Sequence, residues 1–249
     1  MPDGSSTQNP AVLSYLAMRR AVGWIALALP IVLIAVWKFL PGHHALPTSI
    51  SGYYYTPLRN LFEGSLCAIG LFNLCCQGYD ARDEAAGILS ALFAFGVAFC
   101  PTSPSCGYGC PYNCPSASTP CPSPLQTNVG YAHLTFATLL FLTLAYFCLV
   151  LFRQTQVQQA MTRKKRQRNL VYAVCGCVIL ASIGLIVLCR LLNLNQLLFG
   201  LAPMFCFETT SLLAFGAAWL VKGETVLRDE GAPRPRMTVR EANTPWPAN

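Results

Sequence analysis

Six runs of apolar residues alternate with polar segments along the chain, and each run has about the length that a helix needs to cross a membrane. The hydrocarbon core of a bilayer is spanned by roughly 20 helical residues at a rise of ~1.5 Å per residue. The second run contains charged residues and the third is short, so these two fit the rule least well. The pattern predicts an all-α fold, a six-helix transmembrane bundle, with its runs at 21–40, 58–77, 84–100, 131–152, 170–191 and 198–221.

Few charged residues are available to cover a water-facing surface. Of the 249 residues, 54% are hydrophobic and only 11% are charged, whereas soluble domains carry roughly 25% charged residues. This composition excludes the soluble enzyme classes. The first run is longer than a signal-peptide core of roughly 7–15 residues and lacks a small-residue cleavage site, so we expect it to be retained. We expect a tail at 1–20, a membrane domain at 21–221 and a disordered tail at 222–249.

The basic residues predict how the bundle is oriented. The net charge is +7, and if the six helices alternate in direction, 14 of the 17 Lys and Arg residues fall on one side. The exceptions are Lys38, Arg59 and Arg190. Basic loops face the cytoplasm, so we expect both termini and the basic loop 153–169 to be cytoplasmic. The predicted location is a multi-pass position in the cell membrane or an endomembrane, with no nucleic-acid partner.

The basic run of Arg163, Lys164, Lys165 and Arg166 allows two interpretations. Clusters of about four to eight juxtamembrane cations bind anionic lipid headgroups, which would make these side chains a cytoplasmic lipid site. Basic loops also serve simply to orient the helices, which is their commoner use and the interpretation we favour.

A loop rich in cysteine and proline, residues 101–130, would then lie outside the cytoplasm, where thiols oxidise. Zinc sites usually pair cysteines about two to four residues apart and add histidines or a second pair. The spacing here differs, and no histidine lies between the cysteines. Disulfides are therefore favoured over a metal site or free thiols, with connectivity left open, among Cys106, Cys110, Cys114 and Cys121. We expect neither a metal nor a cofactor.

Four ionisable residues lie in runs that otherwise suit lipid: Arg59, Glu63, His133 and Glu208. Such residues cost a few kcal/mol in a membrane and usually face the protein interior or a cavity. All four fall in the outer half, with Glu208 about 15 Å deep. We therefore predict that they share a polar pocket that binds a ligand. Plainer roles also fit: a neutralising Arg59–Glu63 pair, an interfacial histidine and a buried, hydrogen-bonded acid.

Other features of the runs predict packing. A polar stripe continues the charged face of the second run through Cys67, Gly70, Asn73 and Gln77. Small residues at a spacing of four, from Gly87 to Ala98, predict a close contact between helices. Trp37 and the tyrosines at 53–55 predict an aromatic belt at the membrane interface. Pro203 predicts a kink in the last helix.

The layout resembles the damage-regulated autophagy modulator superfamily of six-span membrane proteins. The shared residues are an Ile-Ser pair and a proline before the second run, a histidine opening the fourth and a glutamate in the sixth: Ile50, Ser51, Pro57, His133 and Glu208. Arg59 stands where that superfamily has an acidic residue. The resemblance implies a lipid-related function in a membrane. The layout is also similar to that of uncharacterised bacterial six-span proteins.

These observations favour a non-enzymatic membrane protein that binds a lipid headgroup or a small polar ligand. The first alternative is a proton-coupled transporter that uses Glu208, although no inverted repeat is visible. The second is an intramembrane lipid hydrolase or acyltransferase, for which the G-x-S-x-G and H-E-x-x-H motifs are missing. Membrane lipids are the expected partners, and a homo-oligomer is compatible with the sequence.

Overall fold

The computed structural model describes residues 10–41, 46–75, 81–103, 124–154, 162–192, 194 and 201–226. These residues form α-helices and two short 3-10 helices, and none of them lies in a β-strand. The all-α class predicted from the apolar runs is therefore confirmed. In chain order the elements are α1 (Pro10–Phe39), η1 (Ser51–Tyr55), α2 (Arg59–Cys75), α3 (Ala81–Phe99), α4 (Pro124–Leu149), η2 (Leu151–Arg153), α5 (Arg163–Leu191) and α6 (Pro203–Lys222).

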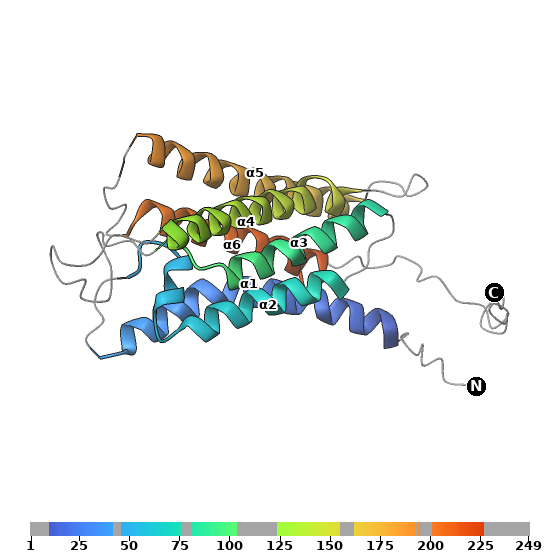
Figure 1. Ribbon diagram of the computed structural model, residues 1–249. Helices are drawn as coiled ribbons and strands as arrows, with labels where there is room; N and C mark the ends of the chain where they lie inside the picture. The colour runs from blue at the N-terminus through green and yellow to red at the C-terminus, as the bar shows by residue number, and fades with distance from the viewer. Residues whose placement is uncertain are drawn as a thin grey trace, which may run out of the picture.

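The six α-helices of the described part form a closed bundle. Each packs against the next helix along the chain, α6 returns to pack against α1, and α4 also touches α6. Neighbouring helices run in opposite directions, so the start of α1 and the end of α6 lie at the same end of the bundle (Figure 1). A hydrogen bond joins the two helices at this end: Nε of Arg20 in α1 donates to the carbonyl oxygen of Gly223, just after α6, at 2.8 Å.

Four helices in the described part are long and apolar enough to cross a membrane. They are α1 from Tyr15 onward, α4 together with η2, α5 and α6. Helix α2 has 17 residues and is therefore only ~26 Å long. Helix α3 carries Asp83 and Glu84 in its first turn. These are the two runs that fitted the length rule least well, so six spans and cytoplasmic termini remain predictions.

The outer surface of the bundle is apolar. Large hydrophobic side chains are exposed on α1 to α5, among them Ile31 at 59%, Leu92 at 55% and Val187 at 50%. Of the described residues of α6, none belongs to this exposed group. Contiguous exposed apolar surface marks contact with lipid or another protein. The surface is thus compatible with an integral membrane protein in which α6 is the most enclosed helix.

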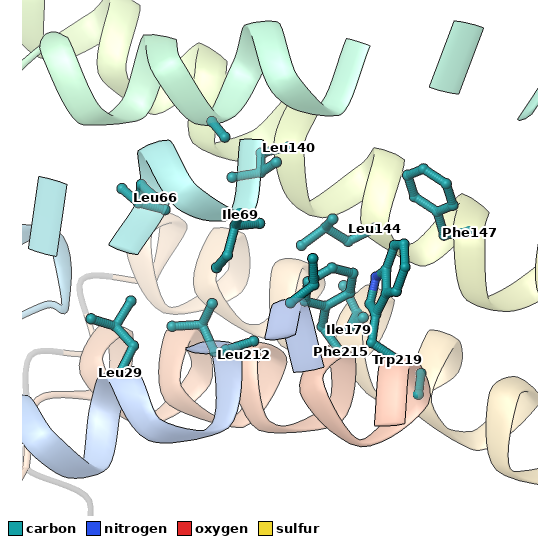
Figure 2. Packing of buried hydrophobic residues seen from close by; sticks show 14 of the residues in the cluster. Leu29, Leu66, Ile69, Leu140, Leu144, Phe147, Ile179, Leu212, Phe215 and Trp219 are labelled. Carbon is teal, nitrogen blue, oxygen red and sulfur yellow. The ribbon is translucent and has the colours of Figure 1, made fainter. Parts of the chain in front are cut away.

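Large apolar side chains fill the interior between the helices. Figure 2 shows residues of α1, α2, α4, α5 and α6 converging there: Leu29, Leu66, Ile69, Leu140, Leu144, Phe147, Ile179, Leu212, Phe215 and Trp219. Near the end of α6, Trp219 is surrounded by aromatic rings, with Phe152 edge-on at 5.2 Å between centroids. The middle of the bundle is accordingly a packed hydrophobic core.

Small residues bring two pairs of helices close together. A Cβ added at Gly216 of α6 would lie 2.9 Å from the carbonyl oxygen of Gly23 of α1, and one added at Gly87 of α3 would lie 2.9 Å from the carbonyl oxygen of Asn73 of α2. Neither position has room for a side chain, because backbone atoms occupy it. The contact predicted from the small residues of the third run is confirmed.

Several helices extend beyond the apolar runs into segments expected to be tails or loops. Helix α1 includes 10–20, α4 includes 124–130 and α5 includes 163–169. A helix continues beyond its apolar stretch wherever its polar residues have good helix propensity and a cap is available. Thr162 provides such a cap, since its hydroxyl accepts a hydrogen bond from the amide of Lys165 at 3.2 Å. The predicted disulfide cysteines, Cys106, Cys110, Cys114 and Cys121, lie outside the described residues.

Candidate functional site

A short segment, residues 46–58, covers one end of the bundle, which we call the capped end; it lies opposite the chain termini (Figure 1). Its central residue, Tyr53, is fully buried. The ring of Tyr53 meets Trp37 of α1 edge-on at 5.8 Å and lies 6.5 Å from Phe205 of α6. Trp37 is also fully buried. The interfacial belt predicted for these two residues is therefore wrong, because both rings pack inside the protein.

Glu208 of α6 fastens this segment to the bundle. Its Oε2 accepts a hydrogen bond from the amide of Ile50 at 2.6 Å, and the amide of Ser51 also interacts with the carboxyl. A carboxylate that accepts from backbone amides makes a strong, charge-assisted bond. The partner atoms belong to the backbone, 158 residues away in the chain.

Helix α6 starts later than predicted, which changes the depth of Glu208. Pro203 occupies the first turn of α6, where its missing N–H costs nothing and its fixed φ suits the helix. The predicted kink at Pro203 is therefore wrong. Glu208 lies five residues after this start, or ~8 Å along the helix, and is thus nearer to the capped end than the 15 Å expected.

Arg59 and Glu63 form the ion pair predicted from their spacing. Nε of Arg59 lies 2.6 Å from Oε1 of Glu63. The same guanidinium donates to the hydroxyl of Tyr54 at 2.6 Å and lies 4.0 Å from the centre of its ring. The Arg59 side chain is nevertheless 49% exposed, against 18% for Glu63. These contacts orient the guanidinium without enclosing it.

His133 of α4 binds the end of a neighbouring helix. Its side chain is only 5% exposed, and Nδ1 lies 2.6 Å from the carbonyl oxygen of Cys100, immediately after α3. The carbonyls at the end of a helix have no partner within it, so a ring N–H at this position donates to one of them. His133 thus has a structural contact of its own, separate from the other three predicted site residues.

The two connecting segments at the capped end are joined to each other. The hydroxyl of Tyr55 donates to the carbonyl oxygen of Thr102 at 2.5 Å. Burial, reinforced by Tyr54 and opposed by Arg59, raises the pKa of the Tyr55 hydroxyl. Tyr55 therefore remains a protonated donor over the physiological pH range, and its bond ties segment 46–58 to the residues that follow α3.

Only two of the four predicted site residues meet. Within the described residues, no hydrogen bond or ion pair joins Glu208 or His133 to each other or to the Arg59–Glu63 pair. The polar stripe on α2 turns from Glu63, which is 18% exposed, to Gly70 and Asn73, both buried against α3. Gln77 lies outside the described residues. A ligand pocket shared by all four side chains remains a prediction.

Two further buried hydroxyls, which no sequence motif indicates, belong to Tyr53 and Thr209. The hydroxyl oxygens of Tyr53 and Thr209 are buried and have no hydrogen-bond partner among the described residues. Tyr53 packs on Phe205, and Thr209 follows Phe205 by one turn of α6, next to Glu208. Buried hydroxyls are nearly always hydrogen-bonded, so each of these two groups is an exception that calls for an explanation. Burial also raises the pKa of Tyr53, which keeps its hydroxyl a donor.

The four cations predicted to contact headgroups do not share one face. Arg163 and Arg166 are exposed, whereas Lys164 and Lys165 are half-buried. The difference arises because all four belong to the first turn of α5, where successive side chains point about 100° apart. Among the described residues, no group of three or more His, Cys, Asp or Glu side chains is placed to hold a metal ion.

Fold and surface together define the class of this protein: an all-helical bundle with an apolar exterior, compatible with insertion into a membrane. Comparison with protein-family models, curated proteins and solved structures gives no significant match. The resemblance to the damage-regulated autophagy modulator superfamily therefore remains a prediction from a few residues.

Proposed function

We propose that this chain is an integral membrane protein that binds a lipid headgroup or a small polar ligand at its capped end. The observation that carries this proposal is the pair of buried, unpartnered hydroxyls of Tyr53 and Thr209. A hydroxyl buried without a partner costs ~1–3 kcal/mol. A ligand with polar atoms offsets this cost by bonding to both groups. If Tyr53 and Thr209 served only for packing, Phe and Val would fill the same positions without an unpaired hydroxyl.

Arg59 is the residue that receives the anionic part of the ligand in this proposal. Its guanidinium is held by Glu63 and by the ring and hydroxyl of Tyr54, yet half of the side chain stays exposed. An oriented guanidinium binds phosphate or carboxylate oxygens through parallel N–H donors. The neighbouring carboxylate of Glu63 suits a headgroup that carries a positive charge beside its phosphate.

Glu208 and His133 act as positioning residues. Glu208 holds the amide of Ile50, and His133 holds the carbonyl of Cys100, so each fixes one of the connecting segments around the ligand. The engagement of the Glu208 carboxyl by backbone amides favours this holding role over proton-coupled transport. Binding without catalysis accounts for the arrangement, and membrane lipids are the proposed partners.

The test measures lipid retained by the full-length chain. Protein reconstituted in nanodiscs of phosphatidylethanolamine and phosphatidylglycerol is released into mild detergent, and bound lipid is counted by native mass spectrometry. We expect Tyr53→Phe and Arg59→Gln to lower retention about 10-fold, the loss of roughly one charge-assisted or buried hydrogen bond. Tyr53→Phe should leave the stability of the ligand-free protein unchanged or raised.

Two matched variants control for general effects. Thr210→Ala removes an exposed hydroxyl next to Thr209, which donates to the Cys206 carbonyl of its own helix, and Lys38→Gln removes an exposed cation at the capped end. Both should retain lipid like the unmodified chain. Equal retention by Tyr53→Phe, Arg59→Gln and the controls would refute the proposal. Displacement of the lipid by soluble glycerol phosphate would identify a small polar ligand instead.

A further inference from the structure

A second charged feature lies at the opposite end of the bundle, which we call the basic end. Its members are side chains from three helices: Arg19 of α1, Lys165 and Arg168 of α5, and Lys222 of α6. Among the described residues, Arg19, Lys165 and Arg168 lie in electrostatic range of the ammonium group of Lys222, as does the carboxylate of Asp83. All four cations are half-buried rather than directed fully into solvent.

The ammonium group of Lys222 has an apolar support on one side. It lies 5.2 Å from the centre of the Phe152 ring, which itself packs edge-on against Trp219 and Tyr172. Among the described residues, no carboxylate forms an ion pair with this ammonium group. The ammonium group carries three N–H donors, from which a phosphate oxygen could accept hydrogen bonds.

Arg19 provides an independent sign that a ligand belongs here. Its guanidinium lies 4.0 Å from the centre of the Tyr15 ring and donates to the Tyr15 hydroxyl through Nη2. Its Nε is buried and has no hydrogen-bond partner among the described residues. A buried, charged donor without an acceptor is costly, and the surrounding cations repel it. An anion with several acceptor oxygens removes both costs at once.

We propose that the basic end binds a phosphate monoester, carried by a lipid headgroup or free in solution, between Arg19, Lys222, Lys165 and Arg168. A phosphate monoester carries up to two negative charges and three acceptor oxygens, which matches a cluster of four cations near the two acidic residues Asp83 and Glu224. Glu224, which follows α6, lies at the same end of the bundle, since it acts on Tyr172 together with Arg19 and Arg168. This inference does not rest on the proposed function of the capped end.

The proposed site differs from the one predicted from the sequence. That prediction took four consecutive cations, of which Lys165 lies in electrostatic range of Lys222. The structure replaces the others by residues that are remote in the chain: Arg19 and Lys222 are joined only because α1 packs against α6. The exposed pair Arg163 and Arg166 therefore provides a control with the same charge on the same end of the molecule.

The experiment titrates the purified full-length chain in detergent with dioctanoyl phosphatidate and follows binding by native mass spectrometry. Inorganic phosphate and glycerol phosphate are the competitor arms. We expect saturable binding that the double variant Arg19→Gln/Lys222→Gln weakens by about 10-fold or more, as the loss of two charge-assisted contacts requires. The double variant Arg163→Gln/Arg166→Gln should weaken it less than about 3-fold, because exposed, screened charges contribute little.

Each outcome decides the proposal. Competition by inorganic phosphate identifies a free phosphate as a ligand, and binding that only the chain-bearing phosphatidate shows identifies a lipid. Absence of saturable phosphatidate binding, or equal losses in both double variants, overturns the site in favour of diffuse attraction. If Arg19→Gln/Lys222→Gln fails to fold, Arg168→Gln replaces it, and full affinity in that properly folded variant also overturns the proposal.

Discussion

The clearest test of the capped end is removal of the carboxyl that holds it. In Glu208→Ala the amides of Ile50 and Ser51 lose their acceptor. Segment 46–58 should then open more often while the rest of the bundle remains packed. Opening exposes Tyr53, so its ring leaves Trp37 and Phe205.

The size of the effect follows from the bond that is lost. A hydrogen bond to a charged acceptor contributes ~1.5–3 kcal/mol, and 1.4 kcal/mol corresponds to about a factor of ten in an equilibrium constant. The opening equilibrium of segment 46–58 should therefore rise about 10- to 150-fold in Glu208→Ala. Glu208→Gln keeps a neutral acceptor for the Ile50 amide, so we expect a smaller rise of roughly 3- to 10-fold.

Amide hydrogen exchange in micelles measures this opening directly, and the fluorescence of Trp37 provides a second signal. Thr210→Ala is the matched control, because its hydroxyl donates to the Cys206 carbonyl of the same helix at 2.8 Å. Peptides covering 46–58 should exchange faster in Glu208→Ala and unchanged in Thr210→Ala. Equal exchange in the two variants would show that Glu208 does not hold the segment.

Three further predictions concern packing and orientation. Gly216→Ala should lower the free energy of unfolding by ~1–3 kcal/mol, because its Cβ would meet the backbone of α1. The control Gly184→Ala, whose Cβ would have nothing within 4 Å, should leave the free energy of unfolding unchanged or raised. Denaturation in mixed micelles compares the two variants, and equal values would refute the close α1–α6 contact. His133→Ala should cost ~1–2 kcal/mol through its lost bond to the end of α3, and Thr135→Ala, an exposed neighbour on the same helix, should cost less in the same assay. Reporters placed at the C-terminus and within 155–161 should both be cytoplasmic in a labelling experiment; labelling of either from outside would overturn the predicted orientation.

The amino-acid sequence was sufficient to predict six α-helices in this bundle, although several helix ends differ from the predicted runs. A helix in a membrane must satisfy its own backbone groups over a fixed thickness, so the length of each apolar run determines where a helix lies. The Arg59–Glu63 pair was predictable for a similar reason, since residues four apart share a helical face. The small residues around Gly87 likewise indicated a close contact through their spacing alone.

The partners of the other polar residues were decided only by the tertiary structure. Glu208 meets the backbone amide of Ile50, and His133 meets the backbone carbonyl of Cys100; every residue has such groups, so no pattern of side chains indicates which one is used. Tyr53 is buried because segment 46–58 folds back between α1 and α6. Its aromatic ring and hydroxyl would equally suit a membrane interface. Arg19 and Lys222 come together for the same reason, since the packing of α6 on α1 joins the two ends of the chain.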